Sequence, residues 1–402
     1  MSIVANEKLA LLGGDPVRPA SKSWPKWPIF DDAERNRLYE VFESGDWWYG
    51  KHVKSFEAEY AAVQGGLYCV SCTSGTTALE IILQAAGIGA GDEVIVPPYT
   101  FYATASAVAR VGATPVFVDV DHTWCLNPAL IEAAITPRTK AIMPVHFGSS
   151  VCDVAAVQAV ADKHGILFFE DACHSWGSQW QGKGTGTLGK AGVFSFQQSK
   201  NISAAEGGAI VTNDKDFADI CRSMTNCGRW EGGVWYEHRH LGTNARLTEF
   251  QGAVLSGQLT RLVEQLHVRA KNATILTQAL SQIEGITPQP GNPGMTRRAY
   301  HLYPLRIDEV AFGCSREKFC EACKAEGLPI GAGYPVPLYK QPFMKQVKGF
   351  DYSMVHCPVT EDLCYKSGMW FHHSILLTSE SDMQDVIRII QKVKDNVSEL
   401  RS

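Results

Sequence analysis

The chain has 402 residues, of which 45% are hydrophobic and 20% are charged, and its formal net charge is −5 at pH 7. This is a globular composition, and the chain is long enough for two lobes with a sizeable core. The slightly acidic balance argues against a nucleic-acid-binding surface or a polybasic membrane anchor. No apolar run approaches the roughly 18 residues of a membrane span, and no signal-peptide pattern opens the chain, so neither nucleic acid nor membrane is an expected partner.

The cysteines indicate the compartment. Twelve of them are scattered from Cys69 to Cys364. In a chain of this length they favour reduced thiols over a disulfide framework, which predicts a cytoplasmic protein. Two pairs have C-x-x-C spacing, but Cys69/Cys72 lie in an apolar run and Cys320/Cys323 lie on a predicted helix. Neither pair has the turn residues of a zinc site, so we expect no metal.

In chain order, an arm rich in Pro and Trp precedes a first predicted helix over residues 31–44. Short apolar segments that predict strands then alternate with helical patterns up to about residue 215. The predicted strands cover 93–96, 115–120, 141–145, 167–169, 193–196 and 209–212, and the helices cover 78–86, 103–111, 129–134 and 154–164. Near-continuous apolar strands that alternate with helices indicate a largely parallel sheet covered on both faces.

The remaining third of the chain predicts a long helix over 247–282, followed by mixed strands and helices that form a second lobe. In the last helix, Ser381 and Gln384 form a capping-box pattern, and apolar residues keep helical spacing from Met383 to Val393. We therefore predict three parts: an N-terminal arm with its helix (1–45), a large domain (46–265) and a small C-terminal domain (266–402).

Three glycine-containing segments could hold a phosphate. Gly184–Lys190 matches two nucleotide-binding patterns, but Ala191 stands where a P-loop needs Ser or Thr, and the next segment predicts a strand. A surface hairpin is therefore the favoured interpretation. Residues 206–208 predict only a turn into a strand. The third segment, Ser74–Gly75–Thr76, opens a helix with a buried face, and a helix N-terminus suits an anion. An ordinary N-cap is the alternative, and Thr77 with Glu80 also forms a capping-box pattern.

An acid and a lysine follow neighbouring predicted strands. Asp171 and His174 come directly after strand 167–169, where parallel sheets bind ligands, and Lys200 follows strand 193–196. A phosphate-type helix start, a strand-end carboxylate and a lysine, in this order, are what pyridoxal phosphate (PLP) requires. The lysine forms a Schiff base, and the carboxylate keeps the pyridine nitrogen protonated. Taken singly, Lys200 could be a solvated loop residue and Asp171 a helix cap or core ion pair.

The chain resembles the DegT/DnrJ/StrS family of sugar and cyclitol aminotransferases, which are PLP enzymes of fold type I. The resemblance rests on ordered segments that cover roughly residues 30 to 265: SGTTALE, GDEVIVPPYTFYATASAV, GATPVFVDVD, TPRTKAIMPVHFG, EDACHSWGS, FSFQQSKNISAAEGGAIVTND and GTNARLTEFQGAVL. It implies an α/β fold with a large PLP-binding domain around a mostly parallel seven-stranded sheet, and a smaller C-terminal α+β domain.

The resemblance also implies residue roles. Lys200 matches the Schiff-base lysine that shuttles the proton, Asp171 matches the carboxylate on the pyridine nitrogen, and His174 matches the partner of the phenolic oxygen. The other implied cofactor contacts are phosphate binding by Ser74, Gly75, Thr76 and Ser195, ring stacking by Phe101 (or Tyr99), and a phosphate contact from the neighbouring subunit by Asn244. The last role implies a homodimer with shared active sites; core packing of Phe101 and helix capping by Asn244 are the alternatives.

The N-terminal segment LLGGDPVRPASKSWPKWPIFDDAERNRLYEVFESGDWW resembles a subgroup with L-glutamine:scyllo-inosose aminotransferases and 3-amino-5-hydroxybenzoate synthases. This implies amino transfer from L-glutamine, or L-glutamate, to the ring ketone of a keto-cyclitol or keto-sugar, ping-pong through pyridoxamine phosphate, in antibiotic-type biosynthesis. Elimination with aromatisation, nucleotide-sugar transamination and a regulator without turnover stay open. Candidate acceptor contacts, each of which could equally be packing, are Trp47, Tyr49, His146, Tyr334, His372 and His373.

Overall fold

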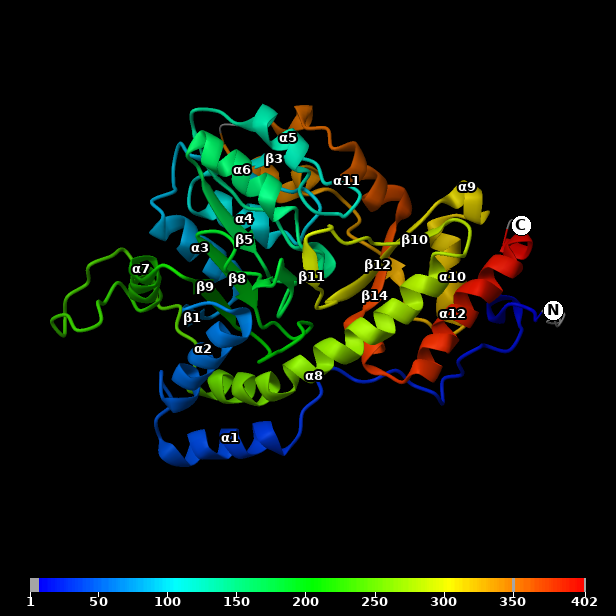
Figure 1. Ribbon diagram of the computed structural model, residues 1–402, viewed down its shortest axis with the longest axis horizontal. Helices are drawn as coiled ribbons and strands as arrows, with labels where there is room; N and C mark the ends of the chain where they lie inside the picture. Colours follow the sequence, from blue (N-terminus) through cyan, green and yellow to red (C-terminus); the bar gives the residue numbers. More distant parts are fainter. Residues whose placement is uncertain (1–6, 349–350, 401–402) are drawn as a thin grey trace.

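A seven-stranded sheet forms the centre of the large lobe in the computed structural model, which describes residues 7–348 and 351–400 (Figure 1). Strand β9 runs antiparallel to both of its neighbours, and the other neighbouring pairs are parallel. The predicted mostly parallel sheet is therefore confirmed. The strands, in spatial order, are β1 (Tyr68–Cys72), β9 (Gly208–Thr212), β8 (Ala191–Ser195), β5 (Leu167–Asp171), β4 (Thr139–Ile142), β2 (Glu93–Val96) and β3 (Thr114–Phe117).

Both faces of this sheet are buried, which explains its near-continuous apolar strands. Along β9, Ile210 packs with one hydrophobic cluster, while Ala209 and Val211 pack with another on the opposite face. The first face is covered by α3 (Gly75–Ala85), α4 (Ala103–Arg110) and α7 (Lys215–Thr225). The second is covered by α2 (Lys51–Gln64), α6 (Val154–His164) and the first half of α8 (Glu249–Leu280). A short helix, α5 (Pro128–Ile131), contacts α6.

The long helix α8 passes from the large lobe to the small one (Figure 1). The predicted boundary at residue 265 falls inside this helix, so the two lobes share one continuous element; the division into domains stays a prediction. The small lobe has an antiparallel sheet in the order β10 (Ile286–Pro288), β12 (Leu302–Ile307), β14 (Gly368–His372) and β13 (Gly331–Ala332). Its helices are α9 (Glu309–Phe312), α10 (Arg316–Ala325), α11 (Pro358–Asp362) and α12 (Glu380–Asp395).

Two predicted helix starts are wrong. The capping box of α12 is formed by Ser379 and Asp382, not by Ser381 and Gln384, because Ser379 is the last residue with extended backbone before the helix. Helix α3 likewise begins at Gly75 with Ser74 as its N-cap, so Thr77 lies in the first turn. Both helices begin earlier than their apolar periodicity indicates, since the first turn of a helix need not contribute to the buried face.

The predicted surface hairpin at Gly184–Lys190 is also corrected. A three-stranded sheet joins β11 (Met295–Arg297), β6 (Gln179–Trp180) and β7 (Lys183–Gly184), and residues 184–186 are buried. The backbone N–H groups of Gly186, Leu188 and Gly189 donate to the buried carboxylate of Glu170, at 2.7, 2.7 and 3.1 Å. This glycine-rich loop therefore binds an anion of the protein itself, which explains both its glycines and its burial.

The N-terminal arm contacts both lobes, apart from residues 1–6, which lie outside the described residues. Arg18 forms ion pairs with Asp382 and Asp385 of α12, at 2.7 and 2.9 Å. Farther along, Trp27 Nε1 donates to the carbonyl of Lys200 at 3.0 Å. The arm then enters α1 (Asp32–Ser44), which is capped by Asp31 and packs on α8. It thus ties the small lobe to the turn that holds Lys200.

Within residues 7–348 and 351–400, no helix is long and apolar enough to cross a membrane. The same ranges hold no cluster of three or more His, Cys, Asp or Glu side chains placed to bind a metal ion. All twelve cysteines have free thiols, and ten of them are buried.

Candidate active site

A cavity of about 540 Å³ lies at the carboxyl ends of β5 and β8, where the small lobe faces the large one. Most of the side chains predicted to bind a cofactor line it. They are Ser74, Gly75 and Thr76 at the start of α3, together with Phe101, Asp171, His174, Ser195 and Lys200. The small lobe contributes His301, Leu302, Tyr334 and Trp370. Residues far apart in the sequence thus meet at one site of a size suited to a small molecule.

Lys200 lies in a turn after β8, held by a backbone hydrogen bond from its N–H to the carbonyl of Gln197. Its Nζ sits 5.7 Å from the centre of the Trp176 ring, and among the described residues no carboxylate forms an ion pair with it. Burial lowers the pKa of this amine, although nearby Cys173 and Asp171 oppose the shift. A lysine with a lowered pKa has a larger neutral fraction, which is the form that attacks a carbonyl.

Asp171 ends β5, and its side chain is fixed from two sides. The Thr104 hydroxyl donates to Oδ2 at 2.7 Å, and the Cys173 N–H donates to Oδ1 at 3.2 Å. Thr104 lies on α4 and is itself fully buried. The carboxylate therefore faces the cavity with a fixed orientation. Thr104 was missed because it stands inside the small-residue run ATASAV; its signal was a hydroxyl on the buried face of a helix.

His174 follows three residues after Asp171 and is buried. The Gly148 N–H donates to its Nδ1 at 3.4 Å, which places the ring proton on Nε2. Burial and the nearby Lys200 lower its pKa well below the usual range, so the ring is neutral. A neutral imidazole with its proton on Nε2 can donate one hydrogen bond into the cavity.

The start of α3 forms an anion-binding corner of the cavity. Ser74 caps the helix by accepting a hydrogen bond from the Thr77 N–H at 3.1 Å, which leaves the first turn facing the cavity with the positive end of the helix dipole. A Cβ on Gly75 would lie 2.8 Å from the Ser195 Cβ, so only glycine permits this close approach of α3 to β8. An amine, a carboxylate, an imidazole N–H and this corner together match the groups on PLP.

Two aromatic residues were alternatives for stacking on the cofactor ring. Phe101 lines the cavity and is 51% exposed, whereas Tyr99 is only 1% exposed. Tyr99 packs among the rings of Trp124, Phe147 and Tyr334 at centroid distances of 5.1 to 5.5 Å. Phe101 is therefore the better placed of the two, because its face remains open to a ligand.

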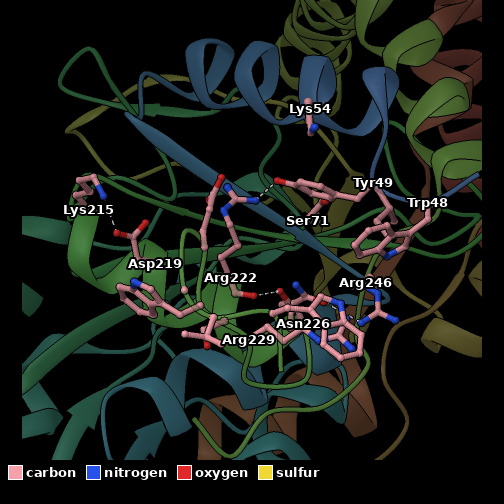
Figure 2. Close-up of a pocket in the computed structure, with 18 residues that line it drawn as sticks. Trp48, Tyr49, Lys54, Ser71, Lys215, Asp219, Arg222, Asn226, Arg229 and Arg246 are labelled. Carbon is pink, nitrogen blue, oxygen red and sulfur yellow. Dashed lines mark hydrogen bonds and ion pairs between the residues drawn. The ribbon is translucent and has the colours of Figure 1, made fainter. Parts of the chain in front are cut away.

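Several predicted residues lie outside this cavity. Tyr49 lines a second cavity of about 600 Å³, together with Trp48, Arg222 and Arg246 (Figure 2). Asn244 lies beside this cavity, because it forms an isolated antiparallel β-bridge with Asn226, which lines the cavity. Trp47 stacks on Phe42 at the surface. Asn244 therefore has no contact with the Lys200 cavity of its own chain, which is the placement that a contact with the neighbouring subunit requires.

The four remaining candidates for acceptor contacts differ in position. Tyr334 lines the Lys200 cavity. His146 is fully buried behind the sheet, with Nε2 2.9 Å from the Glu170 carboxylate. His372 and His373 lie behind His301, and the Nε2 atoms of both approach the Ser199 carbonyl at 3.2 and 3.1 Å. Packing thus accounts for three of these side chains, and their role in substrate binding stays a prediction.

Comparison with known proteins identifies the family of the chain. The model of the DegT/DnrJ/EryC1/StrS aminotransferase family matches residues 28–393. An L-glutamine:2-deoxy-scyllo-inosose aminotransferase of Micromonospora echinospora is 39% identical and is covered over 99% of its length by 98% of this chain. A 3-amino-5-hydroxybenzoate synthase of Amycolatopsis mediterranei is 38% identical, over 91% of this chain and 96% of the relative.

The fold agrees with these relatives. The crystal structure of a 3-amino-5-hydroxybenzoic acid synthase superposes with a TM-score of 0.86 and 36% identity, over 94% of this chain and 99% of that one. The chain therefore belongs to the DegT/DnrJ/EryC1/StrS aminotransferase family and is a PLP-dependent aminotransferase.

Proposed function

We propose that this enzyme transfers the amino group of L-glutamine, or of L-glutamate, to the ring ketone of a keto-cyclitol, in the biosynthesis of an aminocyclitol. The observation that carries the proposal is the complete set of Lys200, Asp171, His174 and the α3 N-terminus around one cavity. The whole-length similarity to an L-glutamine:2-deoxy-scyllo-inosose aminotransferase supports the choice of donor and acceptor.

PLP, when bound, supplies a carbonyl carbon for the amino group and a ring that withdraws electrons from the reacting carbon. Lys200 is the residue that would hold it covalently through Nζ. Asp171, oriented by Thr104, would hold a proton at the pyridine nitrogen. His174 would donate from Nε2 to the phenolic oxygen, and the first turn of α3 with Ser195 would bind the phosphate.

The proton transfers fall to Lys200. With a donor amine in its place, Nζ would be free to act as a base, and burial increases its neutral fraction because it lowers its pKa. Lys200 would take the α-proton of the donor and carry it to the carbonyl carbon that the cofactor supplies. The acceptor ketone passes through the same steps in reverse. One side chain therefore serves both half-reactions, which gives a ping-pong cycle.

We also propose a homodimer with shared active sites. The segment between α7 and α8 projects from the large lobe (Figure 1), and it carries exposed apolar side chains, with Trp235 84% and Leu241 94% exposed. Contiguous exposed apolar side chains mark interaction surfaces. Asn244 lies in the same segment, so a second copy that covers this surface would bring Asn244 to the neighbouring cofactor phosphate. The cytosolic location stays a prediction from the cysteine content.

A second candidate is elimination with aromatisation, as the similarity to 3-amino-5-hydroxybenzoate synthase allows. The two are distinguished by the product, which keeps its ring hydroxyls only after transamination.

The test is the visible spectrum of the purified holoenzyme. L-Glutamine without acceptor should bleach the yellow band of the aldehyde form of the cofactor and release the 2-oxo acid. A keto-cyclitol should then restore the band and yield the amino-cyclitol with its hydroxyls intact. Lys200→Ala should give neither change. A yellow enzyme that is indifferent to glutamine, glutamate and alanine would overturn the donor and favour elimination.

A further inference from the structure

His301 is a side chain of the active-site cavity to which the mechanism above gives no part. It stands just before β12, in the segment AYHLYP, and is 4% exposed. Its ring lies 4.4 Å from the ring of His174 and 5.2 Å from that of Trp176, measured between centroids. It lines the same cavity as Lys200. It is thus held beside the reacting groups by rigid neighbours.

The hydrogen bonds of Asn201 determine the tautomer of His301. Asn201 Nδ2 donates to the Ala299 carbonyl at 3.1 Å, so its Oδ1 must be the atom that lies 3.2 Å from His301 Nδ1. A flipped amide would place its carbonyl against the carbonyl of Ala299. Nδ1 therefore carries the proton and donates it to Asn201. The other ring nitrogen, Nε2, is left with a lone pair and has no hydrogen-bond partner among the described residues.

That lone pair persists at neutral pH. Burial lowers the pKa of His301 well below its usual range, and the charged or chargeable groups around it, Lys200, His174, His373 and His372, act in the same direction. Behind His373 lies Arg269, which is fully buried and donates to His373 Nδ1 at 3.2 Å. The surroundings of His301 are therefore cationic or neutral, and they keep its ring uncharged.

The lone pair on His301 Nε2 suits a substrate hydroxyl better than a substrate carboxylate. It repels a carboxylate, so it does not fit the α-carboxylate of the amino donor, but it accepts a hydrogen bond from a hydroxyl. Of the ionisable side chains near Lys200, His174 presents an N–H, Asp171 is assigned to the pyridine nitrogen, and the Tyr334 hydroxyl can donate as well as accept. Glu206, the other carboxylate of the lining, is exposed at the rim.

We infer that His301 is a specificity residue whose Nε2 accepts a hydrogen bond from the hydroxyl next to the reacting ketone of the acceptor. The inference rests on the proposed function, because only a polyhydroxylated ketone carries such a hydroxyl. It makes Asn201 a positioning residue, since Asn201 holds the proton on Nδ1 and leaves Nε2 free.

The experiment compares His301→Asn with His301→Gln in the holoenzyme. The Asn amide reaches about as far as Nδ1 and keeps the bond to Asn201, but it has no atom at the Nε2 position. The longer Gln side chain places an amide oxygen near that position. His301→Asn should therefore lower kcat/KM for scyllo-inosose roughly ten- to hundredfold, as expected when a buried hydrogen bond loses one partner. His301→Gln should recover most of it.

Three further measurements separate substrate binding from a general loss of activity. The rate at which L-glutamine bleaches the cofactor band should stay within about threefold of wild type in both variants. Binding of scyllo-inositol, which has no ketone and cannot react, should weaken in His301→Asn by a factor similar to that in kcat/KM, as measured by calorimetry. With a trihydroxycyclohexanone that lacks both hydroxyls next to the ketone, wild type and His301→Asn should be equal.

Each contrary result has a distinct meaning. If the glutamine and ketone half-reactions lost equal activity, His301 would act through Lys200 and not through a contact with the acceptor. If kcat/KM with scyllo-inosose were unchanged, His301 would not bind the acceptor at all. Either result overturns the inference and leaves the proposed function standing. A wild-type enzyme that reacts with glutamine but with no polyhydroxylated ketone would instead overturn the proposed acceptor, and the inference with it.

Discussion

Thr104 fixes the Asp171 carboxylate, which we propose holds a proton at the pyridine nitrogen of the cofactor. Its hydroxyl lies 2.7 Å from Asp171 Oδ2, and both side chains are buried. Thr104→Val keeps the shape but removes the donor, which frees Asp171 to rotate and leaves one oxygen without a partner. We expect kcat to fall about tenfold or more, as is usual when a group that orients a catalytic residue is lost. Steady-state kinetics with saturating PLP measure it.

Thr104→Ser is the matched control for this prediction, because it keeps the hydroxyl and loses only a methyl group. It should retain most of the activity. If Thr104→Val were as active as wild type, the Cys173 N–H alone would suffice to orient Asp171.

At the scale of single residues, what the sequence predicts depends on how local the signal is. Lys200, Asp171 and His174 stand in short motifs and line the cavity as expected. Thr104 and His301 could not be found in this way, because they reach the site from 67 residues before Asp171 and 100 residues after Asn201. Their partners are set by the packing of α4 and β12, and no local pattern records it.

At the scale of elements, the glycine-rich loop between β7 and β8 matches a nucleotide-binding pattern but binds a side chain of the protein. Its glycines expose backbone N–H groups, as in a nucleotide-binding loop, but those groups bind Glu170. A Cβ on Gly189 would lie 2.4 Å from the carbonyl oxygen of Phe168, so the glycine is required by close packing. Glu170 itself stands in β5 beside Asp171. The loop therefore helps to hold the strand that carries the catalytic carboxylate.

This arrangement predicts a large effect on stability from a small change. Glu170→Gln replaces an oxygen that accepts hydrogen bonds with an amide NH₂ that faces backbone donors. We expect the free energy of unfolding to fall by about 2 to 4 kcal/mol, because buried backbone donors would lose the carboxylate that accepts their hydrogen bonds. Urea denaturation followed by circular dichroism measures the change.

Glu132→Gln serves as the control, since Glu132 is a carboxylate at the surface that pairs with Lys163 and His164. Its unfolding midpoint should be unchanged. Equal stability of Glu170→Gln and wild type would mean that the loop does not depend on this carboxylate.

Element types were predicted better than element ends. The strand over 93–96 and the helix over 154–164 agree with β2 and α6 at both ends, because apolar periodicity and turn residues coincide there. Strand β1 was not predicted: Ser71 interrupts its apolar pattern, yet its hydroxyl and N–H both bind the buried Glu57. The two hydrogen bonds that Ser71 donates to Glu57 of α2 thus make a polar residue acceptable in a buried strand, and apolar periodicity does not detect them.

At the scale of the whole molecule, the second cavity and the projecting segment beside it lie outside the Lys200 cavity and bear on the proposed homodimer. Trp48, Arg222 and Arg246 line the cavity (Figure 2), and Asn244 lies next to it through a backbone bridge to Asn226. The resemblance implies that Asn244 binds the cofactor phosphate of the neighbouring subunit. The fold places it away from the Lys200 cavity of its own chain, which is why we assign it to the neighbouring one.

Mixing two inactive variants tests this assignment. Lys200→Ala lacks the Schiff-base lysine, and Asn244→Asp places a negative charge against the phosphate. In a mixed dimer with shared sites, one site carries both defects, and the other combines the intact Lys200 of one chain with the intact Asn244 of its partner. Random exchange makes half of the dimers mixed, and each regains one of its two sites. Activity should therefore return to about a quarter of wild type, because every mixed dimer has one fully wild-type site. If Asn244 instead served the cavity of its own chain, each site of the mixed dimer would carry one defect, and the mixture would stay as inactive as its parts.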